Sequence, residues 1–207
     1  RENTASFNTA VGTCSLLCNT TAANNTAVGY NSLCKNTSGS ENVAVGTIVL
    51  DANTTGASNT GVGHESLSGN TTGARNTAMG LGSMYSNTTG GCNTSLGYAS
   101  LTSNTTGDNN TAVGLCVLES NTSGCYNHAL GRNTLMLNTS GCYSTAIGQQ
   151  ALSASVATGD TGNTAVGALA MLTNTTGTNN TAVGRNAMCA NTTGSNNTTA
   201  GKESLLT

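Results

Sequence analysis

The fold is decided by a stretch such as residues 25–41, Asn-Thr-Ala-Val-Gly-Tyr-Asn-Ser-Leu-Cys-Lys-Asn-Thr-Ser-Gly-Ser-Glu. Its opening pentapeptide, or a close relative, returns every 17 residues along the chain, with one interval of 19 caused by a two-residue insertion within 153–162. The pentapeptides begin at residues 8, 25, 42, 59, 76, 93, 110, 127, 144, 163, 180 and 197. A short fixed period is typical of a solenoid, whose repeats bury their apolar residues only against neighbouring repeats. We therefore treat residues 1–207 as one repeat domain.

Each repeat is numbered from the asparagine of its pentapeptide, which is position 1. Thr-Ala-Val at positions 2–4 alternates with a period of two, which favours a β-strand. Glycine at position 5 indicates a corner whose backbone conformation is closed to other residues. Asn-Thr-Thr-Gly at positions 12–15 predicts a second corner, in which glycine or a short polar residue supplies a positive φ. The pattern predicts an all-β fold, a parallel β-solenoid or β-roll of about 12 stacked coils.

Two columns of larger apolar residues are the expected core. The alternation places positions 2 and 4 on the inward face and the alanines of position 3 on the outward face, where they either admit a second chain or line a solvated surface. The expected core residues of position 4 are Val11, Val28, Val45, Val62, Met79, Leu96, Val113, Leu130, Ile147, Val166 and Val183. The expected core residues of position 9 are Leu16, Leu33, Leu50, Leu67, Met84, Leu101, Leu118, Leu135, Leu152, Met171, Met188 and Leu205.

Composition sets this chain apart from ordinary globular domains. Charged residues make up 7% of it and aromatic residues 3%, and proline and tryptophan are absent. A chain so rich in Asn, Thr and Gly could be disordered, but the strict phasing of its apolar residues argues against disorder. The net charge of −2 offers no electrostatic footprint for nucleic acid, and no apolar run is long enough to span a membrane.

Position 12 begins an N-glycosylation sequon in ten repeats. The predicted acceptors, placed at turns expected to be exposed, are Asn19, Asn36, Asn53, Asn70, Asn87, Asn104, Asn121, Asn138, Asn174 and Asn191. N-linked glycans would keep a nearly uncharged rod soluble. The alternative is that these side chains stack as an internal amide ladder. Further sequons begin at Asn24, Asn93, Asn109, Asn179, Asn196 and Asn197.

Eight cysteines occur without the spacing of a zinc site. Cys125 and Cys142 share position 16 in adjacent repeats, and stacked residues lie within the Cα range of a disulfide. Cys18 and Cys34 differ by one position in adjacent repeats, so we predict Cys125–Cys142 and Cys18–Cys34 bridges and an oxidising, extracellular or cell-surface setting. Four others either pair between chains or stay buried, namely Cys14, Cys92, Cys116 and Cys189.

The pentapeptide and the following Ala/Ser-Leu resemble the repeats of YadA-like trimeric autotransporter adhesin heads and of related viral tail fibres. The resemblance covers essentially the whole chain, and it implies a parallel β-roll, often trimeric, used for display and adhesion. Those heads usually repeat at a shorter period, and they lack the cysteines and the column of sequons.

No arrangement of residues points to catalysis, to a metal or to a cofactor. His64 and His128 are isolated, and Asp108 and Asp160 are single acids, unlike the acidic columns of calcium-binding β-rolls. We expect a protein that is not an enzyme.

The ends suggest a mode of assembly. The seven residues before the first pentapeptide and the 11 of the last repeat add to 18, one more than a full coil. Copies stacked head to tail would complete that coil and build an open filament, with lateral association as a further option. The alternative is a trimmed piece of a longer repeat protein, since the chain begins at Arg1 rather than Met.

Three functional hypotheses follow. The first is a structural subunit of an extracellular, glycosylated fibre or surface appendage, and the second is an adhesin or tail-fibre shaft of the YadA-like type. The third is an ice-binding protein, suggested by the threonines of position 2. Their expected inward orientation argues against ice binding, which needs an outward array.

Overall fold

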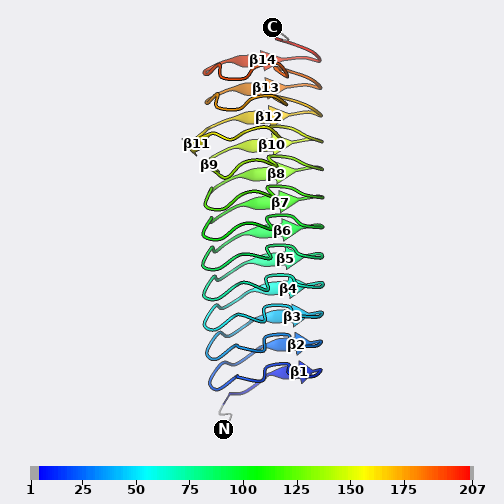
Figure 1. Ribbon diagram of the computed structural model, residues 1–207, viewed down its shortest axis with the longest axis vertical. Coiled ribbons are helices and arrows are strands. Elements are labelled where there is room, and N and C mark those ends of the chain that lie inside the picture. Colours follow the sequence, from blue (N-terminus) through cyan, green and yellow to red (C-terminus); the bar gives the residue numbers. More distant parts are fainter. Residues whose placement is uncertain (1–4, 206–207) are drawn as a thin grey trace.

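The computed structural model describes residues 5–205 as an all-β rod with one short strand in almost every stretch of 17 residues (Figure 1). The strands are β1 (Thr9–Val11), β2 (Thr26–Val28), β3 (Val43–Val45), β4 (Thr60–Val62), β5 (Thr77–Met79), β6 (Thr94–Leu96), β7 (Thr111–Val113), β8 (His128–Leu130), β9 (Ser140–Cys142), β10 (Thr145–Ile147), β11 (Thr158–Asp160), β12 (Thr164–Val166), β13 (Thr181–Val183) and β14 (Thr198–Ala200). Residues 1–4 and 206–207 lie outside the described residues. The expected completion of a coil between two copies depends partly on them.

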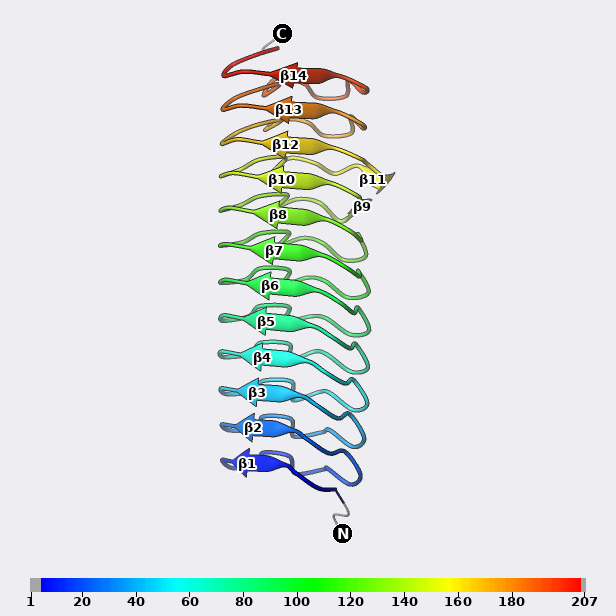
Figure 2. The same cartoon turned by 180° about the vertical axis from the view of Figure 1, so that it is seen from behind.

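Twelve of these strands form one parallel sheet in the order β1-β2-β3-β4-β5-β6-β7-β8-β10-β12-β13-β14. Equal positions of successive repeats face each other, as in the pairs Val28–Val45 and Ala27–Ala44. The sheet runs the length of the rod, with β1 and β14 at opposite ends, and the loops return behind it (Figures 1 and 2). The chain is therefore a parallel β-solenoid of about 11 turns, as the period predicted.

The corner after each strand requires glycine at position 5. These glycines have φ between 126° and 138°, a region that side chains rarely adopt. They also approach one another closely, since a Cβ on Gly97 would lie 2.1 Å from the carbonyl oxygen of Gly114. Both constraints confirm the prediction for this corner.

The second corner is built differently from the prediction. The glycines of position 15 do not adopt a positive φ, and the left-handed residue is instead position 17, for example Glu41 (φ 62°) and Arg75 (φ 60°). Glycine stands at position 15 because the backbones and amide side chains crowd there. A Cβ on Gly56 would lie 2.3 Å from the carbonyl oxygen of Gly73 and 2.5 Å from Oδ1 of Asn53.

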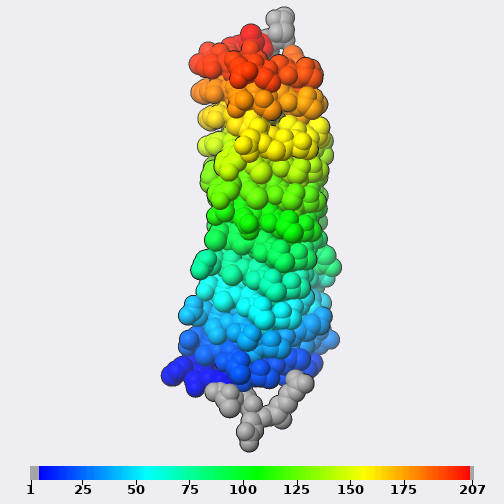
Figure 3. All heavy atoms as spheres, turned by 90° about the vertical axis from the view of Figure 1, so that its left-hand side faces the viewer, coloured from blue at the N-terminus to red at the C-terminus, as the bar shows by residue number. Residues whose placement is uncertain are grey.

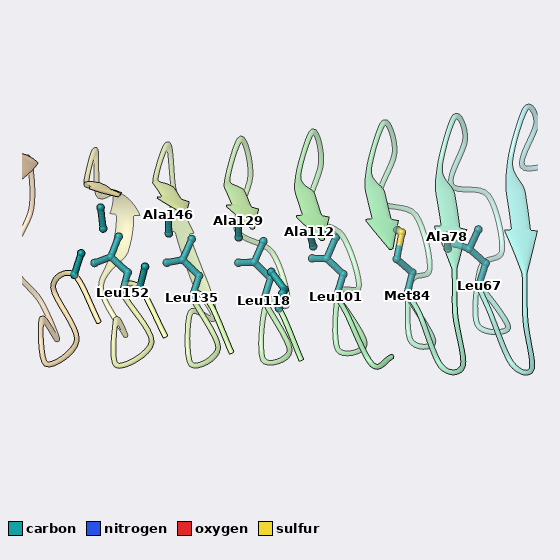
Figure 4. Close-up of a cluster of buried hydrophobic side chains, with 14 of the residues drawn as sticks. Leu67, Ala78, Met84, Leu101, Ala112, Leu118, Ala129, Leu135, Ala146 and Leu152 are labelled. Atoms are coloured by element: carbon teal, nitrogen blue, oxygen red, sulfur yellow. The ribbon is translucent and has the colours of Figure 1, made fainter. Parts of the chain in front are cut away.

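The core corrects the expected orientation of the strand. Position 9 is buried from Leu16 to Met188, and Leu33, Leu101 and Leu135 have no exposed surface. Leu205, expected in the same column, is exposed because no described turn follows it. Its partner across the interior is the alanine of position 3, which points inward toward the leucines (Figure 4). Position 4, expected inside, lies on the outer face, where Val45 is 37% exposed and Leu130 is 47% exposed. The alternation was correct but its phase was wrong, and a shift of one residue turns every side chain to the other face.

Two ladders of buried asparagine side chains complete the interior. At position 12, Nδ2 of Asn70 donates to Oδ1 of Asn53 in the preceding repeat over 2.8 Å and to the carbonyl of Gly73 over 3.0 Å. At position 1, Nδ2 of Asn59 donates to the same carbonyl over 2.9 Å. Because both ladders are bonded to one glycine in each turn, they join the strand to the second corner.

Candidate interaction surface

The outer face of the large sheet carries a continuous row of aliphatic side chains, which we call the aliphatic stripe. Its members are half-buried or exposed along the whole rod. They are Val11, Val28, Val45, Val62, Met79, Leu96, Val113, Leu130, Ile147, Val166 and Val183, the same residues that were expected in the core. A contiguous row of exposed apolar side chains is a candidate interaction surface.

Threonines flank the stripe at position 2 of the same strands. Thr26, Thr77 and Thr111 are half-buried, because the neighbouring repeats cover their sides while the outer face stays open. Val43 and the exposed His128 interrupt the column. The expectation that these threonines point inward is therefore wrong, and the outer sheet face is a threonine–aliphatic array.

Position 6, just beyond the glycine corner, changes character along the rod. Towards the N-terminal end it adds exposed aromatic or aliphatic groups, such as Tyr30 and Tyr98. Towards the C-terminal end it adds exposed cations, namely Arg132, Arg185 and Lys202. The aromatic and aliphatic residues of position 6 thus lie between Tyr30 and Leu115, and its cations lie between Arg132 and Lys202.

Charge is otherwise sparse. Among the described residues the ion pairs are the adjacent His64–Glu65 and Lys202–Glu203, at 3.7 and 3.3 Å. Burial raises the pKa of the Asp51 carboxyl above its usual range, and Lys35 offsets part of that rise. With so few charges, association through the outer face would depend on apolar contact rather than on long-range electrostatic attraction.

The position-12 asparagines are not on exposed turns, which corrects the expected acceptor sites. Asn36, Asn53, Asn70, Asn87, Asn104, Asn121, Asn138 and Asn174 have at most 1% of their surface exposed, Asn19 has 8%, and Asn191 is half-buried. Their Nδ2 atoms, the atoms that would carry a glycan, donate to the ladder, as in Asn104 to Asn87 over 2.8 Å. A glycan there would break the ladder, so the amide-ladder alternative holds.

The remaining sequons divide by position. Asn93, at position 1, is buried in the second ladder. Asn24, Asn179 and Asn196, at position 17, are exposed, while Asn109 and Asn197 are half-buried.

All eight cysteines are free thiols, so neither predicted bridge is present in the structure. Cys125 and Cys142 do stack in adjacent turns, and the amide N–H of Cys125 donates to Sγ of Cys142 over 3.1 Å. Cys18 and Cys34 contact through the backbone, where the Cys18 N–H donates to the Cys34 carbonyl over 3.0 Å. Cys14 and Cys18 lie close enough to Cys34 to contribute to the raised pKa of its thiol, which burial chiefly causes.

Within residues 5–205 the surface has no pocket, and no three metal-ligating side chains gather. The space-filling view shows a rod with side chains in regular layers (Figure 3). None of the described segments is a helix that could cross a membrane. His64 and His128 lie apart on the exposed surface, in turns four repeats from each other. The outer sheet face is therefore the candidate functional site.

Comparisons with protein families, with characterised proteins and with solved structures find no match to this chain.

Proposed function

We propose that this chain is a structural subunit of an extracellular fibre or surface appendage, and that copies associate side by side through the aliphatic stripe. The observation that carries the proposal is the row of position-4 side chains left on the outer sheet face. An isolated rod would keep those side chains in water, whereas a second copy presents the same row at the same spacing. The extracellular setting is inferred from the predicted disulfides, and the resemblance to YadA-like repeats adds a role in display and adhesion.

The area of the face supports this association. Twelve strands spaced about 4.8 Å apart make a face about 55 Å long, and three-residue strands make it about 10 Å wide. That is roughly 550 Å² for each partner and about 1,100 Å² in total, just above the ~1,000 Å² expected of a specific interface. The outer face as a whole, stripe and threonine column together, thus has the area expected of a specific interface.

Head-to-tail stacking is part of the same proposal. β1 and β14 are the edge strands of the large sheet, and each can pair with a further strand of the same form. That strand would come from a second copy of the rod, and lateral and end-on contacts together would build a fibre.

The test uses three lysines on the stripe and three matched lysines elsewhere. The stripe variant carries Val45→Lys, Leu96→Lys and Val183→Lys. The control carries Thr55→Lys, Thr106→Lys and Thr193→Lys, which are exposed in the same repeats but at position 14. Analytical ultracentrifugation should show side-by-side oligomers for the parent chain and the control. For the stripe variant it should show only folded monomers or the end-to-end chains that edge-strand pairing alone can build. A monomeric parent chain would refute lateral association.

The YadA-like alternative, a trimeric adhesin or tail-fibre shaft, shares the stripe as its interface. It differs in requiring a ligand on a cell or particle. Saturable attachment of the oligomer to a defined surface would support it, while long unattached fibres in electron micrographs would support the structural subunit.

Ice binding is a second candidate because the position-2 threonines lie on the outer face and repeat at the strand spacing. The array is uneven, however, since Met79, Leu96 and Leu130 stand among valines. Uneven side chains suit packing against another protein better than contact with a flat crystal plane. A thermal-hysteresis measurement decides between them, and activity lost on Thr77→Lys would favour ice.

A further inference from the structure

One turn of the rod departs from the repeat, and it contains the inserted residues. Serines replace both ladder asparagines there, Ser144 at position 1 and Ser155 at position 12. In the next turn, Nδ2 of Asn163 and of Asn174 donate to the Gly177 carbonyl over 2.8 and 2.9 Å, with no asparagine in the turn before to receive a second bond. Both amide ladders are therefore interrupted at residues 144–162.

The same region builds an extra two-stranded sheet. β9 pairs in parallel with β11, with Cys142 opposite Asp160, and the pair protrudes from the loop side of the rod (Figure 1). The hydroxyl of Thr161 donates to the carbonyl of Cys142 over 2.6 Å. The inserted segment thus docks on β9, at the residue that carries a thiol.

The Cys142 thiol lies beside a second cysteine, Cys125, in the preceding turn. The Cys142 side chain accepts from the Cys125 amide N–H over 3.1 Å, so the two cysteines are in contact through a thiol and a backbone amide. The neighbouring rings of Tyr126 and Tyr143 stack, with centroids 5.1 Å apart and planes at 3°. Cys125 therefore lies next to Cys142, and Tyr126 next to Tyr143, in the two adjacent turns.

We propose that Cys125 and Cys142 form a disulfide that joins their turns next to the interruption of the ladders. The oxidant is a small-molecule disulfide of the glutathione type. One cysteine thiolate attacks it, forming a mixed disulfide and releasing one glutathione thiolate. The second cysteine thiolate then attacks the protein sulfur of the mixed disulfide and releases a second glutathione.

The chemistry is balanced, because the two cysteine protons and two electrons leave on two molecules of glutathione. A covalent link at β9 restrains the segment on which the insertion docks, where fewer side-chain hydrogen bonds hold successive turns. Burial raises the pKa of the Cys142 thiol, so the link should form faster as the pH rises. The proposal is independent of lateral association.

Trypsin makes the test direct, because Cys142 is the sole cysteine in the peptide 133–185. The preceding peptide, 76–132, holds Cys92, Cys116 and Cys125. In a Cys92→Ser, Cys116→Ser double variant, Cys125 is alone in its peptide. After incubation of the full chain with oxidised glutathione, mass spectrometry of a non-reduced digest should show 76–132 linked to 133–185. The oxidised double variant should also unfold at a higher temperature than its reduced form.

Adding Cys125→Ser should abolish the linked peptides and the shift in unfolding temperature together. The proposal fails if Cys142 is recovered only as a glutathione adduct or as a free thiol. It also fails if the linked peptides occur only in a covalent dimer, which a non-reducing gel separates from the monomer.

Discussion

Nδ2 of Asn104 donates a hydrogen bond of 2.8 Å to Oδ1 of Asn87, one turn earlier in the rod. The same nitrogen donates to the Gly107 carbonyl over 3.0 Å, while Oδ1 of Asn104 accepts from Nδ2 of Asn121 over 2.8 Å. Every group of this side chain is thus used inside the protein, and the bonds run along the axis of the rod.

Replacing Asn104 with alanine should lower the free energy of unfolding by about 2–4 kcal/mol, because the change removes three buried hydrogen bonds and leaves Oδ1 of Asn87 without its amide donor. Urea denaturation followed by circular dichroism measures it. The control is Thr106→Ala, at the exposed position 14 of the same repeat, which should cost less than about 1 kcal/mol. Equal costs would mean that the ladder does not stabilise the rod.

Replacing Gly97 with alanine should destabilise the protein by at least about 3 kcal/mol, because its backbone conformation and its neighbour both exclude a Cβ. Its φ is 138°, and the added carbon would lie 2.1 Å from the Gly114 carbonyl oxygen. Gly82→Ala is the matched control, since φ is 63° and no atom lies within 4 Å of the added carbon. Thermal unfolding should show a cost of about 1 kcal/mol there.

The inverted strand phase predicts opposite roles for two nearby leucines. Leu101→Ala should cost about 2–5 kcal/mol, since the side chain is fully buried at position 9. Leu96→Ala, on the aliphatic stripe, should cost less than about 1 kcal/mol in urea unfolding at a protein concentration where the rod is monomeric. The original expectation of a position-4 core would require similar costs at both sites.

The carboxyl of Asp51 predicts a pH dependence. Burial raises its pKa above the ordinary value of 3.8 in the folded protein, so the folded state binds the proton more tightly than the unfolded state. The resulting stabilisation is complete below pH 3.8 and is lost as the pH rises through the folded pKa. Asp51→Asn should therefore unfold at a higher temperature than the parent chain near neutral pH, and at a similar temperature in acid. An equal difference at both pH values would contradict this account.

The pairing of the strands could be predicted from the sequence because it depends only on spacing. A period of 17 residues places Val28 beside Val45 whatever the orientation of their side chains. The need for glycine at position 5 could also be predicted, because glycine occupies that corner in all 12 repeats. These are properties of the backbone and of the repeat length.

The phase of the strand was not settled by the pattern, because both faces of Thr-Ala-Val carry an apolar residue. A signal was present in the sizes. Position 3 holds only Ala, Gly, Ser or Thr, whereas position 4 ranges from Ala and Val to Met and Leu. A narrow interior facing a leucine leaves room only for small side chains, so the uniformly small column was the buried one.

The sequon asparagines illustrate the same division. Their spacing predicted that they stack in a column. The same sequence suits a row of glycan acceptors and an amide ladder, and only the burial of the side chains distinguishes the two. By itself, the sequence determined the period, the glycine corner at position 5 and the stacking of equal positions on each other, since these follow from the length of the repeat and its invariant glycine. Only the tertiary structure decided which face of the strand packs against the position-9 leucines. That choice depends on the distance between the sheet and the returning loop, which leaves room for one large side chain and one small one. This choice leaves the aliphatic stripe outside.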